Sequence, residues 1–499
     1  MSKTSRDLAY PFLLAFICIF VFFLPSCTSE NQNDQVAATT VTLTINGAVF
    51  EIDPNTSQVY EVPQLRVDAP NYAKVEYTGS KNKYSVLLND VVLGSQETSF
   101  GLDEIGCNTY ISLEITDLNT QQSIISSIRT YPISAPQFIA EHFSEQVQSG
   151  SYFLTLNNYL LKTDAIGNII FYWNLGETVL DFKAHELPTE NLYSFALAST
   201  EGLGLGDVGY VPASELVMDQ EYNVIDNVPY LLENELVRNR TPLDSHDFIV
   251  LGRGHYIVIG YYGKTVFNIP DHIPHSEYGT RVAAAIIQEI DNNKLVWQWD
   301  STDYPELYDL SLNADYYNKK EQWNDYAHLN SIQIDPKDGN YLCSFRNLST
   351  ILKINSKTGE IIWFLGGKMD EFNLTQIQKT SFQHYARYTD KGSITVFDNG
   401  NKSYDSFVEG KSRVVEYWIN EQTKTLQQFK EYTINEEFSA TMGSAQKLED
   451  DLFVIGWGGR TTKAPVMSVI DFNAQKTIFH IVYPLTDYFS NSYRVYYDD

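Results

Sequence analysis

The chain has 499 residues, and its 63 acidic residues outnumber its 35 lysines and arginines, which gives a formal net charge of -28 at pH 7. This balance argues against nucleic acid as a partner, because the phosphates would be repelled. It also means that an anionic ligand needs a local positive site to overcome the overall field. The length predicts two domains rather than one compact core.

The N-terminus has the pattern of an export signal. A positively charged start precedes an apolar run from Phe12 to Leu24, which is shorter than the roughly 20 residues that span a bilayer. The run ends in Leu-Pro-Ser-Cys27, which resembles a bacterial lipobox. We therefore expect residues 1–27 to be a lipoprotein signal peptide ending at the lipidated Cys27; the alternative is an ordinary cleaved signal. The protein is then an exported lipoprotein, anchored to a membrane at its periplasmic face or at the cell surface.

Beyond the signal, the sequence holds two cysteines, Cys107 and Cys343, which lie far apart. There is no Cys-x-x-Cys pair and no zinc-binding spacing. We expect no disulfide framework, no metal and no cofactor.

Short strands are predicted after a polar tether at residues 28–38. β-Branched or aromatic residues alternate with polar ones, and turn clusters separate the segments. The predicted strands are Thr40–Ile45, Ala73–Thr78, Tyr84–Leu88, Tyr110–Thr116 and Ile124–Tyr131. Residues 39–135 are therefore expected to form a small N-terminal β-sandwich, which ends near Pro132 and Pro136.

Residues 136–499 contain a repeated hairpin pattern. A strand leads through an Asp/Asn-x-x-x-Gly turn to a second strand that ends in an aromatic residue. The clearest copy runs from Ile351 through Gly359 to Trp363. The other copies begin at Leu160, Glu215, Ile287, Val414 and Ser468. An all-β chain with six such four-stranded units is typical of a six-bladed β-propeller, with the aromatic residue packed between neighbouring sheets.

Three histidines stand at the same phase, each at or just before the first strand of a unit. They are His246 in Ser-His-Asp-Phe, His328 in Ala-His-Leu-Asn and His384 in Phe-Gln-His. Arg346 follows His328 by 18 residues, and we expect it on the next strand of that unit. The first strands line the centre of a propeller, so the four side chains are predicted to meet there. One such histidine is more often structural, but three in phase with an arginine indicate a functional site.

This set of side chains suits the transfer of an anionic group. Arginine binds sulfuryl or phosphoryl oxygens through two parallel N–H donors. A neutral imidazole can attack the central atom, and another can protonate the leaving oxygen. Transfer through a covalent N–S bond divides one difficult step into two easier ones. The sequence has no Walker loop, dinucleotide fingerprint or Gly-x-Ser-x-Gly motif.

The segments around these four residues resemble those of the bacterial arylsulfate sulfotransferases. So do Trp-Phe-Leu-Gly-Gly from Trp363 and Val-Phe-Asp-Asn-Gly from Val396. The resemblance extends over essentially the whole mature chain and implies an exported six-bladed propeller. It also implies transfer of a sulfuryl group from a phenolic sulfate ester to a phenol, without a nucleotide donor, by a ping-pong path through a sulfohistidine.

The resemblance assigns roles to the predicted site residues. It implies that His384 is the nucleophile and that His246 is the acid/base for the phenol oxygen. His328 and Arg346 would hold the sulfuryl oxygens.

Further expectations follow from the same resemblance. Asn330 and Thr441 would complete the substrate-binding shell. Some family members carry a closely spaced disulfide near the site, which this sequence lacks, and the soluble members have no lipobox. Analogy with the family suggests a homodimer.

Two other functions remain open. A propeller of this kind can serve as a non-catalytic surface module that binds sulfated or glycan ligands, or it can be a quinone- or metal-dependent oxidoreductase. The three histidines together with the arginine favour catalysis, since binding alone needs no nucleophile. The lack of metal-spaced ligands disfavours the oxidoreductase. The remaining histidines are expected to be surface or packing groups.

Overall fold

The computed structural model describes residues 40–65, 71–78, 83–88, 91–100, 110–132, 135–136, 138–144, 149–199, 204–205, 209–238, 240–312, 323–401, 410–433, 438–459, 465–483 and 493–498. These residues are nearly all strand and turn, as the sequence predicts, and within them the α-helical structure is limited to α1 (Glu306–Leu310). None of the helices in these ranges is long and apolar enough to cross a membrane. The predicted signal peptide with Cys27, the tether and Cys107 lie outside the described residues.

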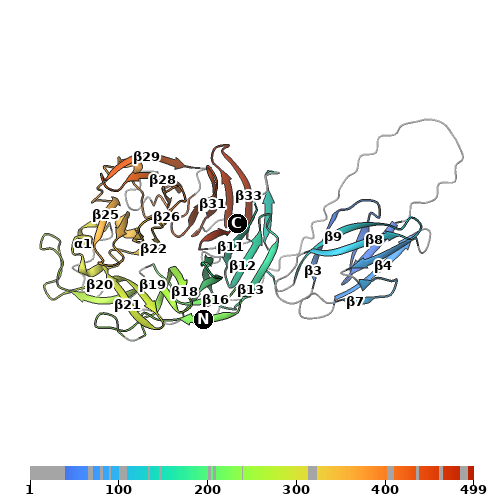
Figure 1. Cartoon of the computed structure of the whole chain (residues 1–499), viewed down its shortest axis with the longest axis horizontal. Helices are drawn as coiled ribbons and strands as arrows, with labels where there is room; N and C mark the ends of the chain where they lie inside the picture. The colour runs from blue at the N-terminus through green and yellow to red at the C-terminus, as the bar shows by residue number, and fades with distance from the viewer. Residues whose placement is uncertain are drawn as a thin grey trace, which may run out of the picture.

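Two sheets form the N-terminal part (Figure 1). One has the strand order β2-β1-β4-β7, and the other has the order β3-β9-β8-β5-β6 with β3 parallel to β9. The strands are β1 (Thr40–Ile45), β2 (Ala48–Ile52), β3 (Val59–Leu65), β4 (Asn71–Thr78), β5 (Tyr84–Leu88), β6 (Val91–Val92), β7 (Thr98–Phe100), β8 (Tyr110–Asp117) and β9 (Gln122–Pro132). Buried side chains alternate with more exposed ones along β1 and β5, and those of both sheets join in one core.

The strand predictions for this part are confirmed for β1, β4, β5, β8 and β9. Four strands were not predicted. Strand β2 is largely exposed, and β3 lies at a sheet edge and contains Pro63, which has no N–H to donate. Strands β6 and β7 have only two and three residues. Short or weakly alternating segments of this kind give little periodic signal.

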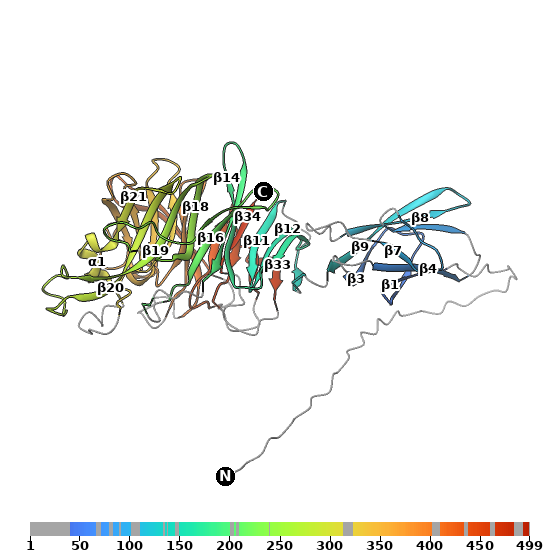
Figure 2. The same cartoon turned by 90° about the horizontal axis from the view of Figure 1, so that it is seen from below.

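The larger part consists of four-stranded antiparallel sets arranged around a common centre (Figure 1). In the described part of the chain these sets number six: β34 with β11–β13, then β14–β17, β18–β21, β22–β25, β26–β29 and β30–β33. Pairing of β16 with β18 joins the second and third sets into one sheet, and β10 (Ile139–His142) pairs with the outer strand β33. Figure 2 shows the ring from the side, with β18 and β19 next to each other.

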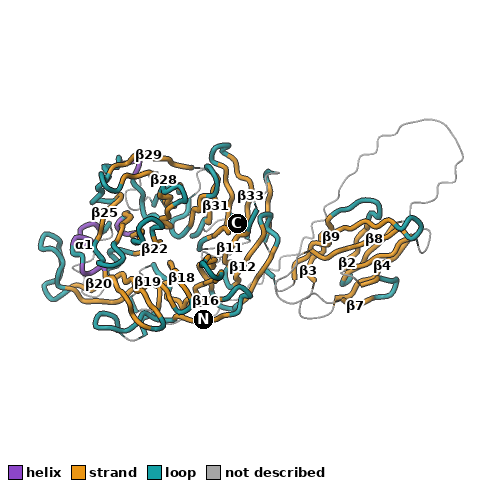
Figure 3. Tube along the Cα trace, in the orientation of Figure 1, coloured by secondary structure: helices purple, strands orange, loops and turns teal. Residues whose placement is uncertain are grey.

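The first three sets have the following bounds: β11 (Ser151–Leu156), β12 (Tyr159–Asp164), β13 (Ile169–Asn174), β14 (Val179–Glu186), β15 (Asn191–Ala198), β16 (Pro212–Met218), β17 (Val224–Val228), β18 (Leu243–Gly252), β19 (His255–Val266), β20 (Thr280–Asp291) and β21 (Lys294–Asp300). The other three have these: β22 (Leu329–Ile334), β23 (Tyr341–Phe345), β24 (Thr350–Ile354), β25 (Ile361–Gly366), β26 (His384–Tyr388), β27 (Ile394–Asp398), β28 (Arg413–Asn420), β29 (Thr425–Tyr432), β30 (Ser444–Lys447), β31 (Leu452–Gly456), β32 (Met467–Asp471), β33 (Lys476–Val482) and β34 (Val495–Asp498). Figure 3 shows how little helix interrupts these strands.

The C-terminal strand closes the ring. The innermost strands β34, β14, β18, β22, β26 and β30 contact one another in that order, and β30 in turn contacts β34. Strand β34 pairs with β11, with Val495 opposite Leu154 and Tyr497 opposite Tyr152. The last residues of the chain therefore join the first and last sets around the centre.

The repeated sequence pattern forms the hairpin between the third and fourth strands of each set, as predicted. In the clearest copy, Asn355 Oδ1 accepts hydrogen bonds from the N–H groups of Lys357 and Thr358. Gly359 then has a φ of +81°, and Gly167 has a φ of +87° in the equivalent turn. Glycine adopts this left-handed backbone without steric cost, which explains its place in the pattern.

The aromatic residue at the end of the pattern packs between neighbouring sets in some copies only. Trp363 is fully buried, and its indole N–H donates to Glu421 of the next set at 3.1 Å. Trp173 is 36% exposed, so the prediction is wrong for that copy. Its strand β13 is the outermost of its sheet, and its ring meets Phe195 of the next set only at an edge, with 6.1 Å between ring centroids.

Candidate active site

The three predicted histidines lie together at the centre of the ring. His246 is on β18, His328 directly precedes β22, and His384 begins β26. The ring centroid of His246 is 5.1 Å from that of His328 and 6.3 Å from that of His384. All three side chains are buried. Three imidazoles from three different sets thus form one compact group.

Irregular backbone in the innermost strands presents these side chains. The pairing of β18 with β19 shifts at residues 244–247, which form a bulge that includes His246. His328 has a φ of +56°, and Tyr385, which follows His384 in a bulge of β26, has a φ of +53°. Such left-handed residues cost about 1–3 kcal/mol each and gather at functional sites, where the surrounding structure holds them.

Two of the imidazoles pair with buried carboxylates. His246 Nδ1 lies 2.5 Å from Asp244 Oδ2, and His328 Nδ1 lies 2.5 Å from Asp325 Oδ2. The second oxygen of each carboxylate is buried and has no hydrogen-bond partner among the described residues. An acceptor at Nδ1 fixes the proton on that nitrogen, so Nε2 of each neutral ring presents a lone pair.

His384 has a neutral partner instead. Its Nδ1 lies 2.7 Å from Asn399 Oδ1. The Asn399 amide nitrogen donates to the backbone oxygens of Ser439 and Met442, at 2.9 Å each. Because both amide donors are used, the amide oxygen faces the ring and Nδ1 carries the proton. Nε2 then presents a lone pair, and the backbone N–H of Met442 approaches it only at 3.3 Å, a long hydrogen bond.

Burial and positive charge keep His384 neutral. Burial lowers the pKa of His384 well below its usual range, and the nearby Arg346 guanidinium and His246 add to the lowering. Burial also lowers the pKa of His328, against the opposing effect of Asp325. A neutral imidazole has its lone pair available for attack, so His384 is fit to act as a nucleophile near neutral pH.

Arg346 lies beside the histidines, but not on the strand where the sequence analysis placed it. It begins the 3-10 turn η2 (Arg346–Leu348), directly after β23. Its backbone N–H donates to the carbonyl oxygen of His328 at 2.8 Å, and the left-handed backbone of His328 ends the regular ladder there. The guanidinium lies over the Phe382 ring, 4.7 Å from its centroid, and donates to Asn347 Oδ1 at 2.8 Å.

Asn330 and Thr441 lie near this group, and their contact with a substrate stays a prediction. Asn330 is fully buried on β22 and donates to the backbone oxygen of Gln383 at 2.8 Å. Its Oδ1 has no hydrogen-bond partner among the described residues, so it is available to a ligand. Thr441 is partly buried and precedes Met442, whose N–H contacts His384.

The partners of the imidazoles and the aromatic wall beside them were not predicted from the sequence. The two carboxylates stand two and three residues before their histidines, a spacing too common to be a signal. The Tyr261 ring lies 5.9 Å from His328, and the Tyr493 ring lies 5.7 Å from His246. Tyr210 stacks on Tyr261 at 4.3 Å. Burial raises the pKa of all three phenols, so they remain uncharged, and such a wall offers an aryl group a stacking surface.

A cavity lies at the end of the innermost strands away from the three histidines. Its volume is about 780 Å³, and it is lined by later residues of these strands, including Gln333. An ion cluster forms its floor: the Asp247 carboxylate lies 2.7 Å from Lys183, 2.7 Å from Arg387 and 3.2 Å from Arg494. Asp247 directly follows His246 on β18, so the cluster adjoins the histidine site.

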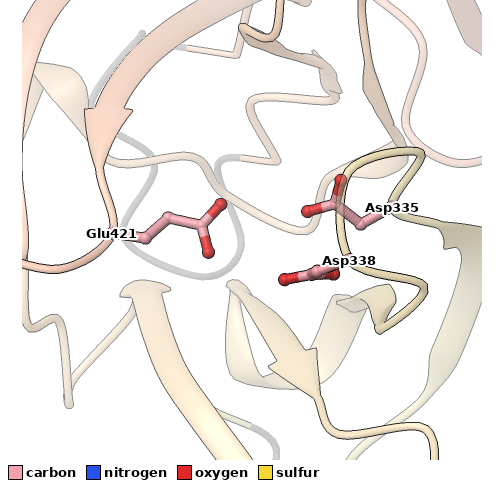
Figure 4. A group of neighbouring side chains, drawn as sticks. All are labelled: Asp335, Asp338 and Glu421. Carbon is pink, nitrogen blue, oxygen red and sulfur yellow. The ribbon is translucent and has the colours of Figure 1, made fainter.

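One group of acidic side chains in the described ranges has ligand-like spacing. It consists of Asp335, Asp338 and Glu421 (Figure 4). The ammonium group of Lys353 lies 2.7 Å from Asp335, 2.7 Å from Asp338 and 2.6 Å from Glu421. A lysine thus already pairs with all three carboxylates, and we interpret the group as a salt-bridge cluster between two neighbouring sets.

The chain matches one family of known proteins. The family model described as Arylsulfotransferase (ASST) matches residues 205–494, a range that contains all six predicted catalytic and substrate-binding residues. No curated protein matches the chain significantly.

Several solved structures are similar to the chain at low identity. A protein of unknown function from Bacteroides caccae has 11% identity over 70% of this chain and 98% of its own, with a TM-score of 0.40. Dihydro-heme d1 dehydrogenase NirN in complex with DHE has 9% identity over 73% of this chain and 82% of its own, with a TM-score of 0.33. Hsv2 from Kluyveromyces lactis has 9% identity over 78% of this chain and 94% of its own, with a TM-score of 0.30. At these TM-scores the likenesses carry no argument about this chain.

Proposed function

Because this chain belongs to the arylsulfotransferase family, we propose that it moves a sulfuryl group from a phenolic sulfate ester to a phenol through a sulfohistidine at His384. One observation carries the proposal. His384 is buried and neutral, its Nδ1 proton is held by Asn399, and its Nε2 lone pair receives only a long hydrogen bond, 3.3 Å from the Met442 N–H. A nucleophile in this state needs no base to activate it.

In the first half-reaction, Nε2 of His384 attacks the sulfur of the donor. The N–S bond forms as the bond between sulfur and the aryl oxygen breaks, and the departing phenolate takes a proton from His246. Charge spreads over the peripheral sulfuryl oxygens in the transition state, as it does in phosphoryl transfer. Arg346 and His328 stabilise those oxygens, because fixed donors in a buried site act strongly on developing charge.

In the second half-reaction, a phenol acceptor takes the place of the first product. His246, now neutral, accepts the acceptor's proton while the phenol oxygen attacks sulfur. The N–S bond breaks, and His384 returns to its neutral form. Asn330 and Thr441 complete the substrate-binding shell. The same imidazole thus acts as acid in one direction and as base in the other.

The proposal extends to the architecture. We propose that the six sets around the centre are the blades of a six-bladed β-propeller, and that the two N-terminal sheets form a β-sandwich. The circular order of contacts between the innermost strands and the closure by β34 support the propeller. The single core shared by the two N-terminal sheets supports the sandwich.

Location and partners are also proposed. We propose that the apolar segment ending at Cys27 is an export signal and that the protein is a lipoprotein on a membrane surface, in the periplasm or on the outside of the cell. The acidic net charge of -28 is unfavourable for nucleic acid. A homodimer is expected by analogy with the family.

The test is sulfuryl transfer by the purified full-length chain in detergent, with a chromogenic aryl sulfate, a phenol acceptor and no nucleotide. Release of the chromophore should depend on the acceptor, and His384→Asn should abolish it. His272→Asn is the matched control, because that imidazole is 66% exposed. It should retain wild-type activity.

Other outcomes point to other functions. Release of the chromophore without acceptor indicates a hydrolase. Reversible binding of aryl sulfates without release, in the wild-type chain, indicates a non-catalytic binding module. Either result contradicts the proposal.

A further inference from the structure

The three imidazoles have different partners, and this difference assigns them different charges during transfer. Resting on the proposed function, we propose that Asp244 and Asp325 are positioning residues that make His246 and His328 the two proton-carrying imidazoles. Asn399 keeps His384 the neutral one. Asp244, Asp325 and Asn399 can set these protonation states without touching the substrate.

The carboxylates are placed to hold a proton on their histidines. Each lies 2.5 Å from its imidazole Nδ1, and the side chains of Asp244 and Asp325 are at most 5% exposed. Within the described residues, neither carboxylate pairs with a lysine or an arginine. A buried carboxylate whose only charged neighbour in contact is an imidazole holds the proton at Nδ1 and offsets the charge of a second proton at Nε2.

Asp325 also determines the hydrogen-bond polarity of His328. Because Nδ1–H of His328 is directed to Asp325, Nε2 of the neutral ring carries only a lone pair, which repels a sulfuryl oxygen. His328 can donate from Nε2 only when the ring carries a second proton. Arrival of an anionic donor beside Arg346 then favours uptake of that proton, with Asp325 balancing the charge.

Asp244 stabilises the protonated form of His246 in the same way. At the moment of transfer, Nε2 of His246 must carry a proton to protonate the departing phenolate, and it must lose that proton before taking the acceptor's. The carboxylate at Nδ1 stabilises the imidazolium form and fixes the ring orientation.

The other groups around the His246–Asp244 and His328–Asp325 pairs do not change these protonation states. Phenols of Tyr210, Tyr261 and Tyr493 lie close to the carboxylates, and burial raises the pKa of each, so they stay neutral. Glu215 is fully buried near Asp244, and its pKa is raised well above the usual range. The remaining charges at the histidines are Arg346 and the other imidazoles, which lower the pKa of His384 and His328.

Asn399 differs from the carboxylates in one respect that matters. It accepts from Nδ1 of His384 with the same geometry but brings no negative charge. Its amide is locked by the two backbone oxygens that it donates to, so it holds one tautomer without stabilising the imidazolium. The nucleophile is thereby distinguished from its two neighbours.

The first test uses Asp244→Asn and Asp325→Asn in the full-length chain. Asp244→Asn should lower kcat about 100- to 10,000-fold with little change in donor KM, because general acid–base catalysis is lost. It should also remove the limb of the pH–rate profile that reports the proton on His246. Asp325→Asn should raise the donor KM about 10-fold or more, since a charged hydrogen bond to the sulfuryl group is lost. Asp244→Glu, which restores a carboxylate, should recover part of the activity.

A matched control comes from a pair outside the site. His255 Nε2 lies 2.8 Å from Glu289, so Glu289→Gln removes a carboxylate from a histidine without touching the three imidazoles. This variant should keep the wild-type pH profile. If Asp244→Asn and Asp325→Asn also keep it, the inference is overturned.

A second test does not depend on catalysis or on the variants. Titration of the wild-type chain with inorganic sulfate, by calorimetry in buffers of different ionisation enthalpy, should show uptake of a proton on binding. Nitrogen-15 spectra of labelled imidazoles should locate it on His246 or His328 and should show His384 neutral. A proton on His384, or binding with no uptake, contradicts the inference. Absence of transfer by the wild-type chain contradicts only the proposed function.

Discussion

At the scale of single residues, the polar partner at Nδ1 distinguishes three histidines of identical type. His246 and His328 pair with carboxylates, and His384 pairs with an amide oxygen. A negative partner favours the imidazolium, whereas a neutral partner fixes only the tautomer. The site therefore contains two candidates for proton transfer and one neutral nucleophile, although all three rings lie in the same buried group.

The buried neutral state of His384 predicts a dependence of stability on pH. Its pKa in the folded chain lies well below the unfolded value near 6.5. As the pH falls below 6.5, the unfolded chain takes up a proton that the folded chain does not, so the free energy of unfolding decreases. For one such group the decrease is up to about 1.4 kcal/mol per pH unit. Urea denaturation at pH 7.5 and 5.5 measures it.

His384→Asn should lose this contribution and show a smaller difference between the two pH values. His272→Asn, in which an exposed histidine is replaced, should keep the wild-type difference. Equal pH dependence in all three proteins contradicts a neutral buried His384.

The histidines themselves were predictable, but their partners were not. His246, His328 and His384 share a phase in the repeat, and a repeat brings equal positions together. Asp244 and Asp325 carry no such signal, because their carboxylates reach the imidazoles only through a bulge and a left-handed residue. The sequence contains no signal for the bulge. It contains none for the left-handed residue either, because that residue is His328 rather than a glycine.

At the scale of the elements, four of the innermost strands are irregular next to the centre. Bulges occur in β14, β18, β22 and β26, each close to a side chain at the centre. A bulge bends a strand and turns a side chain out of the regular alternation. The sequence predicted the outer hairpins well, because their turns need Asn or Asp and glycine at set positions. It misplaced Arg346, since the end of β23 depends on the backbone of His328 across the ladder.

Neighbouring sets are joined by the salt-bridge cluster of Figure 4, and this predicts a large effect of one lysine. Lys353 is 2% exposed and bridges Asp335 of its own set to Glu421 of the next. Lys353→Met leaves the buried Asp335 carboxylate without its counter-ion, which costs about 3–5 kcal/mol. Thermal or urea denaturation should show a clear loss of stability.

The control for this variant is Lys357→Met, because Lys357 lies exposed on the turn that follows β24. It should change the stability by less than about 0.5 kcal/mol. Comparable stability of the two variants contradicts a role of the cluster in joining the sets.

At the scale of the whole molecule, the ring is held together at its centre by charge as well as by strand pairing. Asp247 of β18 binds Lys183 of β14, Arg387 of β26 and Arg494 beside β34. Its carboxylate also accepts the backbone N–H of Ile332 on β22 at 2.9 Å. One carboxylate therefore contacts groups from four other innermost segments, directly next to the histidine site.

This arrangement predicts that Asp247→Asn destabilises the ring. Three buried cations lose a shared counter-charge, and the cost is about 3–5 kcal/mol. Thermal denaturation followed by near-ultraviolet circular dichroism measures the loss. Asp271→Asn, in an exposed loop, is the control and should denature as the wild type does. Equal denaturation midpoints for Asp247→Asn and the wild type would show that the Asp247 ion cluster does not stabilise the centre of the ring.

The central claim is that His384 carries the sulfuryl group between donor and acceptor. The most direct measurement is mass spectrometry of peptides from the full-length chain after brief incubation with an aryl sulfate alone, kept at neutral to alkaline pH. We predict one SO3 group on the peptide that contains His384, formed with one equivalent of released phenol and removed when a phenol acceptor is added. Turnover with no label on His384, or with the label on another residue, would contradict the account.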